Sequence, residues 1–203
     1  LKVIREMRPL IVSAEKCNPL EVNMQIATEQ FDVIHYAGHG FFDKKREQAG
    51  WVLDQKCWLS AEDMFRVRQV PRLVFANACF SAVTLSDSPA SSGHEDPRKD
   101  FVSVAMAFFR RGIPNFVGTG WKVDDAVAKI CSQYFYALAL GLQRPDARQL
   151  PIKPELMTIA AALRDARIET MRFDKKSSTW GAYQHYGRVS DRLLAPAPEG
   201  STF

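Results

Sequence analysis

Short apolar runs alternate along the chain with segments in which apolar residues recur at helical spacing. Residues 31–37 and 72–78 are mostly apolar and are flanked by polar residues, which is typical of strands buried on both faces. A third such run covers 115–119. Apolar positions recur every three or four residues over 125–141 and 154–172, which predicts two amphipathic helices. This alternation predicts an α/β fold with a mainly parallel central sheet.

Further elements are marked by residues that favour the ends of helices. Pro19 suits the first turn of a helix over 19–30. Ser60 suits the N-cap of a helix over 61–69, with Asp63 in the position of the capping-box acid. We also expect a hairpin formed by 51–54 and 56–59, a buried helix over 101–111 ended by Gly112, and a closing strand over 180–186.

One segment breaks this rhythm. Residues 82–100 are rich in turn-forming and charged residues and have no apolar period, so we expect a mobile, exposed loop. A regulatory or processing role and a plain surface insertion are both open for it. With 203 residues and 46% apolar composition, the chain can form one sizeable core. We therefore expect a single domain over 1–194 and a flexible tail over 195–203.

Charge and cysteine usage narrow the class of protein. The net charge is only +4, and the one basic cluster covers 44–46, so we expect no direct nucleic-acid partner. The four cysteines lack Cys-x-x-Cys spacing. No secretory signal is visible at the amino end, and no apolar run approaches the roughly 20 residues that span a bilayer. We expect no membrane partner and a cytoplasmic protein with reduced thiols.

Two strand ends carry the candidate chemistry. His-Tyr-Ala-Gly-His-Gly at 35–40 and Ala-Asn-Ala-Cys-Phe-Ser at 76–81 close the first two apolar runs. If these strands are neighbours, His39 and Cys79 reach the same crevice, where a thiol and an imidazole form a nucleophile–base pair. A turn at His39 would leave the Gly40 amide free to bind an oxyanion. The structural alternatives are a small core cysteine and a simple glycine-containing turn.

Metal and phosphate sites are less well supported. His35 and His39 are four residues apart, but they lie on a predicted strand and its following loop, and no Glu completes a His-Glu-x-x-His motif. The glycines at 38 and 40 lack the later glycine and lysine of a phosphate-binding loop. We expect neither a metal nor another cofactor.

Together, the motifs at 35–40 and 76–81 resemble those of the CHAT-domain proteases, caspase-like cysteine peptidases related to caspases, metacaspases and separase. Segments 117–125 and 180–187 are also similar to the family pattern, so the resemblance covers about residues 30–190. It implies a caspase-like α/β/α sandwich with His39 as general base and Cys79 as nucleophile. It also implies a structural or orienting role for His35.

The sequence departs from the caspase signature Gln-Ala-Cys-x-Gly, since Asn77 and Ser81 replace its first and last residues. Related metacaspases carry an acid at the position of Asn77. The separase-like segment 121–125 places Asp124 and Asp125 where a carboxylate can meet a basic substrate side chain, although Asp125 also suits a helix cap. The candidate substrate-binding residues are Asn77, Trp121, Asp124 and Asp125.

These observations predict a cysteine endopeptidase that cleaves a protein substrate. The resemblance implies control by a sensor domain or partner subunit outside these residues, in a bacterial defence or signalling system. Two alternatives stay open: a catalytically silent domain that serves as an interaction scaffold, and a thiol hydrolase such as an amidase or acyltransferase. Retention of both His39 and Cys79 argues against the scaffold.

Overall fold

The computed structural model describes residues 11, 17–43, 48–54, 57–60, 63, 69–79, 108–142 and 156–194. The elements in chain order are α2 (Pro19–Thr28), β1 (Val33–Asp43), β2 (Gln48–Asp54), β3 (Cys57–Ser60), β4 (Leu73–Cys79), β5 (Phe116–Thr119), α4 (Asp125–Ala139), α5 (Ile159–Phe173), α6 (Thr179–Ala182) and β6 (Tyr183–Tyr186).

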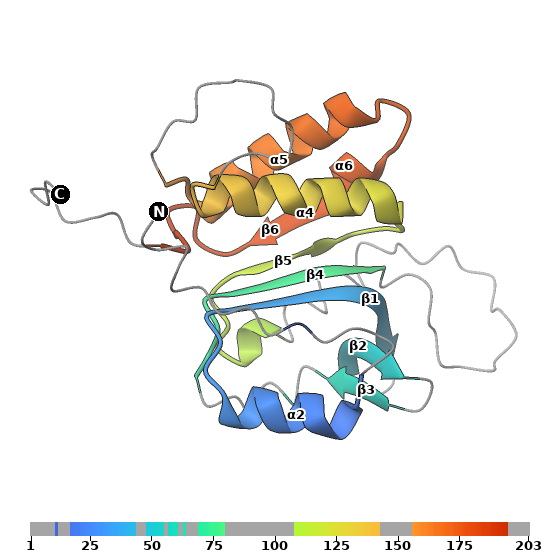
Figure 1. The fold of residues 1–203 in the computed structure, drawn as a ribbon, viewed down its shortest axis with the longest axis vertical. Coiled ribbons are helices and arrows are strands. Elements are labelled where there is room, and N and C mark those ends of the chain that lie inside the picture. The colour runs from blue at the N-terminus through green and yellow to red at the C-terminus, as the bar shows by residue number, and fades with distance from the viewer. Residues whose placement is uncertain are drawn as a thin grey trace, which may run out of the picture.

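The six strands form one sheet in the order β3-β2-β1-β4-β5-β6. The pairs β1–β4 and β4–β5 are parallel, whereas β1–β2, β2–β3 and β5–β6 are antiparallel. Helices α4, α5 and α6 cover one face of the sheet, and α2 lies on the other (Figure 1). The predicted α/β sandwich is confirmed, and parallel pairing is confined to its three central strands.

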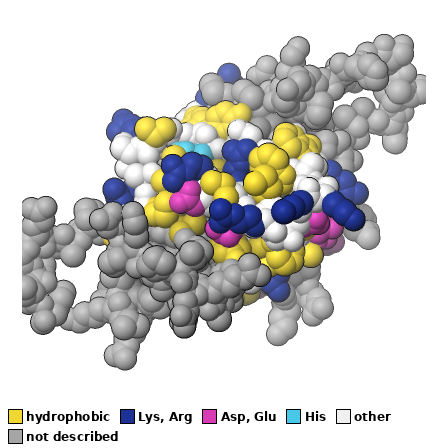
Figure 2. Space-filling model, turned by 90° about the horizontal axis from the view of Figure 1, so that it is seen from above, with side chains coloured by type: hydrophobic (Ala, Val, Ile, Leu, Met, Phe, Trp, Pro, Cys, Tyr) yellow, Lys and Arg dark blue, Asp and Glu magenta, His cyan; other side chains and the backbone are white. Residues whose placement is uncertain are grey.

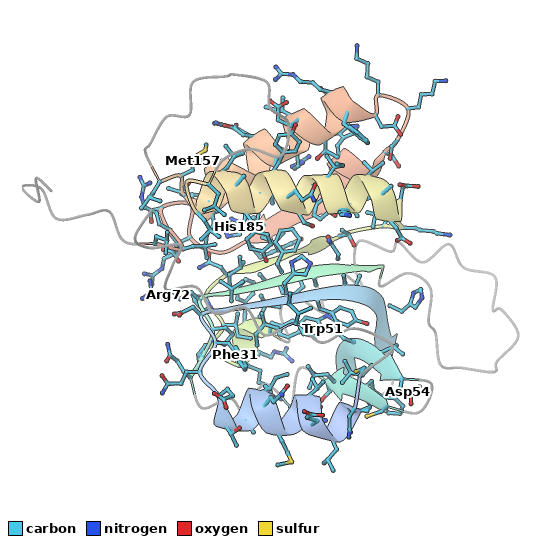
Figure 3. All side chains as sticks on the ribbon, viewed as in Figure 1. Phe31, Trp51, Asp54, Arg72, Met157 and His185 are labelled. Atoms are coloured by element: carbon cyan, nitrogen blue, oxygen red, sulfur yellow. The ribbon has the colours of Figure 1, made fainter. Side chains whose placement is uncertain are left out.

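The central strand β4 supplies both hydrophobic cores. Leu73 and Phe75 pack toward α4 and α5, while Val74 and Ala76 pack on the α2 side, and all four are fully buried. Side chains fill both layers between the sheet and its helices, with Trp51 on the α2 side (Figure 3). Because successive residues of a strand point to opposite faces, a strand covered on both sides must be apolar throughout. This explains the uninterrupted apolar run over 73–76.

Polar caps define where the helices begin. Asn18 Oδ1 accepts hydrogen bonds from the amides of Leu20 and Glu21 at the start of α2, as expected for a helix there. The helix predicted to start at Pro154 begins instead at Ile159, where Thr158 Oγ1 accepts from an amide of the first turn. Thr158 thus satisfies one of the amide donors that the first turn of a helix leaves unpaired.

Two expectations at strand ends are corrected. The first strand continues to Asp43, because residues 40–43 pair with residues 48–51 of β2, so His39 lies within a strand and not in a loop. The closing strand is shorter than predicted, since Thr179–Ala182 forms the helical turn α6 and only Tyr183–Tyr186 pairs with β5. The α6 turn is closed by a hydrogen bond from the Gly181 amide to the Ser178 carbonyl, 3.0 Å long.

The capping box predicted at Ser60 is present. The Ser60 amide and hydroxyl each donate to Asp63 Oδ2 over 2.8 Å, and the Asp63 amide donates to Ser60 Oγ over 3.2 Å. Gly112 adopts a positive φ of 84°, as a helix-ending glycine does. Several predictions fall outside the described residues: those for the basic cluster at 44–46, for a loop over 82–100, for most of the helices expected over 61–69 and 101–111, and for a tail over 195–203.

The outer surface of the helical layer has mixed character. Seen from the α5 side, Lys and Arg side chains are spread among hydrophobic and acidic ones (Figure 2). On α5, Arg164 pairs with Asp165 and Arg172 pairs with Glu169, and exposed pairs of this kind contribute little stability. Within the described segments, no helix has both the length and the apolar character needed to cross a membrane.

Candidate active site

The two strand-end motifs meet in the centre of the sheet. In the parallel pairing of β1 with β4, His39 lies directly opposite Cys79, which is the last residue of β4. On its other side Cys79 is paired with Thr119, the last residue of β5. His39 is exposed. The carboxyl ends of neighbouring parallel strands are where open α/β sheets bind ligands.

An irregularity in β4 lies immediately before Cys79. Ala76 pairs with Gly118 and Cys79 with Thr119, so two additional residues of β4 occupy the space before the last pair. The buried Thr119 hydroxyl donates to the Ala78 carbonyl over 2.8 Å and holds this segment. Such bulges redirect a strand locally and recur beside active sites.

The side chain of Asn77, within this irregularity, is fixed by two hydrogen bonds. Its Nδ2 donates to Ser132 Oγ on α4 over 2.7 Å, and its Oδ1 accepts from the Tyr183 hydroxyl on β6 over 2.6 Å. Ser132 Oγ in turn donates to the Ala128 carbonyl over 2.9 Å. Asn77 therefore ties the end of β4 to two other elements, and its role in substrate binding stays a prediction.

His35 belongs to the packing between the sheet and α4. Its Nδ1 lies 2.9 Å from the Tyr136 hydroxyl, and its ring stacks on Phe75 with 5.0 Å between centroids. The residue keeps solvent-exposed surface, but these contacts remove water from the ring and lower the pKa of His35 to about 4. Burial raises the pKa of Tyr136, so a protonated hydroxyl faces a neutral imidazole. Among the described contacts, none joins His35 to His39.

Gly40 marks the point where β1 changes partner. Residues 33–39 of β1 pair with β4, and Gly40 is the first residue paired with β2, opposite Trp51. Gly40 is buried inside the strand, and the free turn predicted around it is replaced by this change of pairing. Its role as an oxyanion donor stays a prediction.

The segment after β5 contains the remaining predicted residues. Asp124 is the N-cap of α4, because its Oδ1 accepts from the Val127 amide over 3.0 Å. This corrects the expectation that Asp125 caps the helix, since Asp125 is its exposed first residue. The half-buried Trp121 ring lies close against the backbone of Gly181, where an added Cβ would come within 3.2 Å of it.

Two other thiols lie in surroundings that disfavour reactivity. Cys131 is fully buried, and desolvation raises the pKa of its thiol to about 12. Burial also raises the pKa of Cys17, with nearby Asp54 and Cys57 acting in the same direction. Because the thiolate is the nucleophilic form, neither environment favours attack at neutral pH. The described residues contain no group of three or more His, Cys, Asp or Glu that could hold a metal ion.

The residues that support the two motifs were not identified from the sequence. Tyr36 contacts the backbone of His39, while Ser132 and Tyr183 hold Asn77, and Thr119 holds Ala78. Tyr36 lies inside the histidine motif, so its position in the sequence could have indicated a role in supporting His39. Ser132 and Tyr183 are 55 and 106 residues from Asn77, and no local pattern connects them to it.

Comparison with protein families gives a match that covers most of the chain. The sequence model of the CHAT domain, a domain related to caspase-like cysteine proteases, matches residues 6–188 and so includes both strand-end motifs. No curated protein matches the chain.

Proposed function

Because the chain belongs to the CHAT domain family, we propose that it is a cysteine endopeptidase with Cys79 as nucleophile and His39 as general base. The observation that carries the proposal is the register of β1 and β4, in which these two residues form the last pair of the parallel ladder. Directly opposed positions on neighbouring strands share a face of the sheet. The exposure of His39 supports its access to a bound peptide.

The proposed chemistry uses the two residues in succession. The imidazole of His39 takes the proton of the Cys79 thiol, and the thiolate forms a C–S bond with the carbonyl carbon of the substrate. The imidazolium then gives this proton to the leaving amine as the C–N bond breaks. In the second half, His39 removes a proton from water, the resulting hydroxide cleaves the acyl-thioester, and the thiol is restored.

Oxyanion stabilisation is assigned to the backbone at Gly40. Within the described residues, the pairing of β1 with β4 ends at His39, and from Gly40 onward β1 pairs only with β2. A backbone amide on that edge can donate to the oxyanion as the tetrahedral intermediate forms.

We assign the binding of the substrate side chain to the segment after β5. Thr119 is the register partner of Cys79, and residues 121–125 follow it directly. Asp124 is committed to capping α4, so the exposed Asp125 is the better candidate to meet a basic substrate side chain. Trp121 would form part of the wall of the substrate-binding cleft. The enzyme would act on a protein substrate under the control of a sensor domain or partner, in a defence or signalling system.

Active-site labelling tests the proposal directly. A peptidyl acyloxymethyl ketone should alkylate Cys79, and both Cys79→Ala and His39→Ala should abolish labelling while the circular dichroism spectrum is retained. Cys131→Ala is the matched control, because it removes a buried thiol of raised pKa and should leave labelling intact. Labelling that persists in Cys79→Ala, or that disappears equally in Cys131→Ala, would overturn the assignment.

A further inference from the structure

Tyr36 makes an unusual contact with the strand that carries it. Its hydroxyl lies 2.9 Å from the carbonyl oxygen of His39 and 2.7 Å from that of Val52 on β2, within donating distance of both. The ring is held flat against Trp51, with 4.7 Å between centroids and 7° between planes. Burial raises the pKa of Tyr36 to about 12, so the hydroxyl keeps the proton that it donates.

Gly38 supplies the space for this contact. A Cβ built at Gly38 would lie 2.8 Å from Cζ of the Tyr36 ring and closer still to its hydroxyl oxygen. Real Cβ atoms essentially never make contacts this short, so the ring would have to shift, and a shift disturbs its stacking on Trp51 and its two hydrogen bonds. The glycine between Tyr36 and His39 is therefore needed for the ring to fold back along the strand.

The contact is placed where β1 changes its pairing partner. His39 is the last β1 residue paired with β4, and Gly40 is the first paired with β2. The Tyr36 hydroxyl joins the two sides of this change, since one carbonyl belongs to β1 and the other to β2. The orientation of the peptide that follows His39 is thereby fixed by a side chain from the hydrophobic core.

Tyr36 cannot take part in the chemistry itself. It packs in the core on the α2 side of the sheet, and residues 36 and 39 are an odd number apart along β1, so they occupy opposite faces. Its influence on His39 must pass through the backbone carbonyl.

From these observations we propose that Tyr36 is a positioning residue for His39, and that Gly38 is required because it admits the Tyr36 ring. The inference rests on the proposed function, in which His39 is the general base. It explains why tyrosine and glycine stand at these two places in the His-Tyr-Ala-Gly-His-Gly motif.

The test compares Tyr36→Phe with His39→Ala in the full chain. Tyr36→Phe keeps the ring and its stacking on Trp51 and removes only the hydroxyl. We expect labelling by the peptidyl acyloxymethyl ketone to slow about three- to tenfold, the loss that one hydrogen bond can cause. The pH profile of Cys79 alkylation by iodoacetamide should shift toward that of His39→Ala, a change that reduced stability alone would not produce.

Tyr186→Phe is the matched control, because Tyr186 packs against the same core cluster but lies on the edge strand β6. It should leave both measurements unchanged. If the Gly38→Ala variant folds, its pH profile should match that of Tyr36→Phe. If it does not fold, the Tyr36→Phe variant alone tests the positioning role.

The outcomes separate the inference from the proposed function. Wild-type rates and pH profile in Tyr36→Phe, with labelling lost in His39→Ala, would overturn the positioning role and leave the peptidase assignment standing. Equal slowing in Tyr36→Phe and Tyr186→Phe would also overturn it. Unchanged labelling in His39→Ala would overturn the proposed function and this inference with it.

Discussion

The hydroxyl of Tyr183 on β6 donates a 2.6 Å hydrogen bond to Oδ1 of Asn77 on β4. The two residues belong to strands on either side of β5, so the bond passes across the face of the sheet that α4 covers. It joins a fully buried tyrosine to the residue two positions before Cys79. The amide of Asn77 is thus oriented from both ends, because Ser132 holds its Nδ2.

This arrangement predicts that Asn77→Asp destabilises the fold. A carboxylate cannot donate to Ser132 Oγ, whose own proton is given to the Ala128 carbonyl. Replacing the donor by a charge in this partly buried position should lower the free energy of unfolding by about 1–3 kcal/mol. Urea denaturation would measure it, with the exposed substitution Asp125→Asn as control. Equal stability of Asn77→Asp and the wild type would show that the network contributes nothing.

The cap of α4 gives a second prediction. Asp124→Ala should cost about 1 kcal/mol of stability, because the Val127 amide loses its acceptor. Asp124→Asn should cost far less, since asparagine caps helices about as well as aspartate. Thermal unfolding of the two variants would compare them. The cap would be irrelevant to stability if alanine and asparagine behaved alike.

Substrate preference can be assigned to one of the two aspartates. If the Asp125 carboxylate meets the substrate, cleavage should favour bonds that follow Arg or Lys, and Asp125→Asn should weaken that preference severalfold. Asp124→Asn should leave it largely unchanged, because the Asp124 side chain bonds to its own helix. Profiling against a peptide library would measure both. Cleavage after aliphatic residues, unaltered by either substitution, would contradict the assignment.

Stability should fall on mild acidification. Desolvation lowers the pKa of His35 to about 4, and that of His185 is lowered for the same reason. Between the unfolded pKa near 6.5 and these lower folded values, the unfolded chain binds more protons. The two residues therefore contribute stability that is complete above about pH 6.5 and is lost as the pH falls below it, over a range that for His35 extends to about pH 4.

Unfolding free energies measured from pH 7.5 to 4.5 would show this loss. His35→Gln should flatten part of the slope, because glutamine does not titrate in this range. A slope that is identical in His35→Gln and the wild type would mean that His35 does not contribute.

Much of this protein follows from local patterns. The apolar run within 72–78 identifies a strand covered on both faces, and residues 73–76 are fully buried. Residues 31–37 lead into a strand as predicted, but none of them is fully buried, so burial on both faces is wrong for that run. The motifs that end these runs predicted that His39 and Cys79 lie close together, and the register makes them direct partners on neighbouring strands. Pro19 was correctly interpreted as the sign of a helix start, and the predicted hydrogen bonds between Ser60 and Asp63 are present, since capping depends only on neighbouring residues.

Other features were decided only by contacts between distant segments. The first strand extends through His39 to Asp43 because β2 pairs with its far end, and strand pairing is not encoded in the strand alone. The backbone of Asp124 at the start of α4 is held by α6, because Thr179 Oγ1 accepts a hydrogen bond from the Asp124 amide. The sequence by itself determined which residue types stand at the strand ends. The tertiary structure decided how Tyr36, Asn77 and their partners hold them, because those hydrogen bonds join elements that only the folded chain brings together.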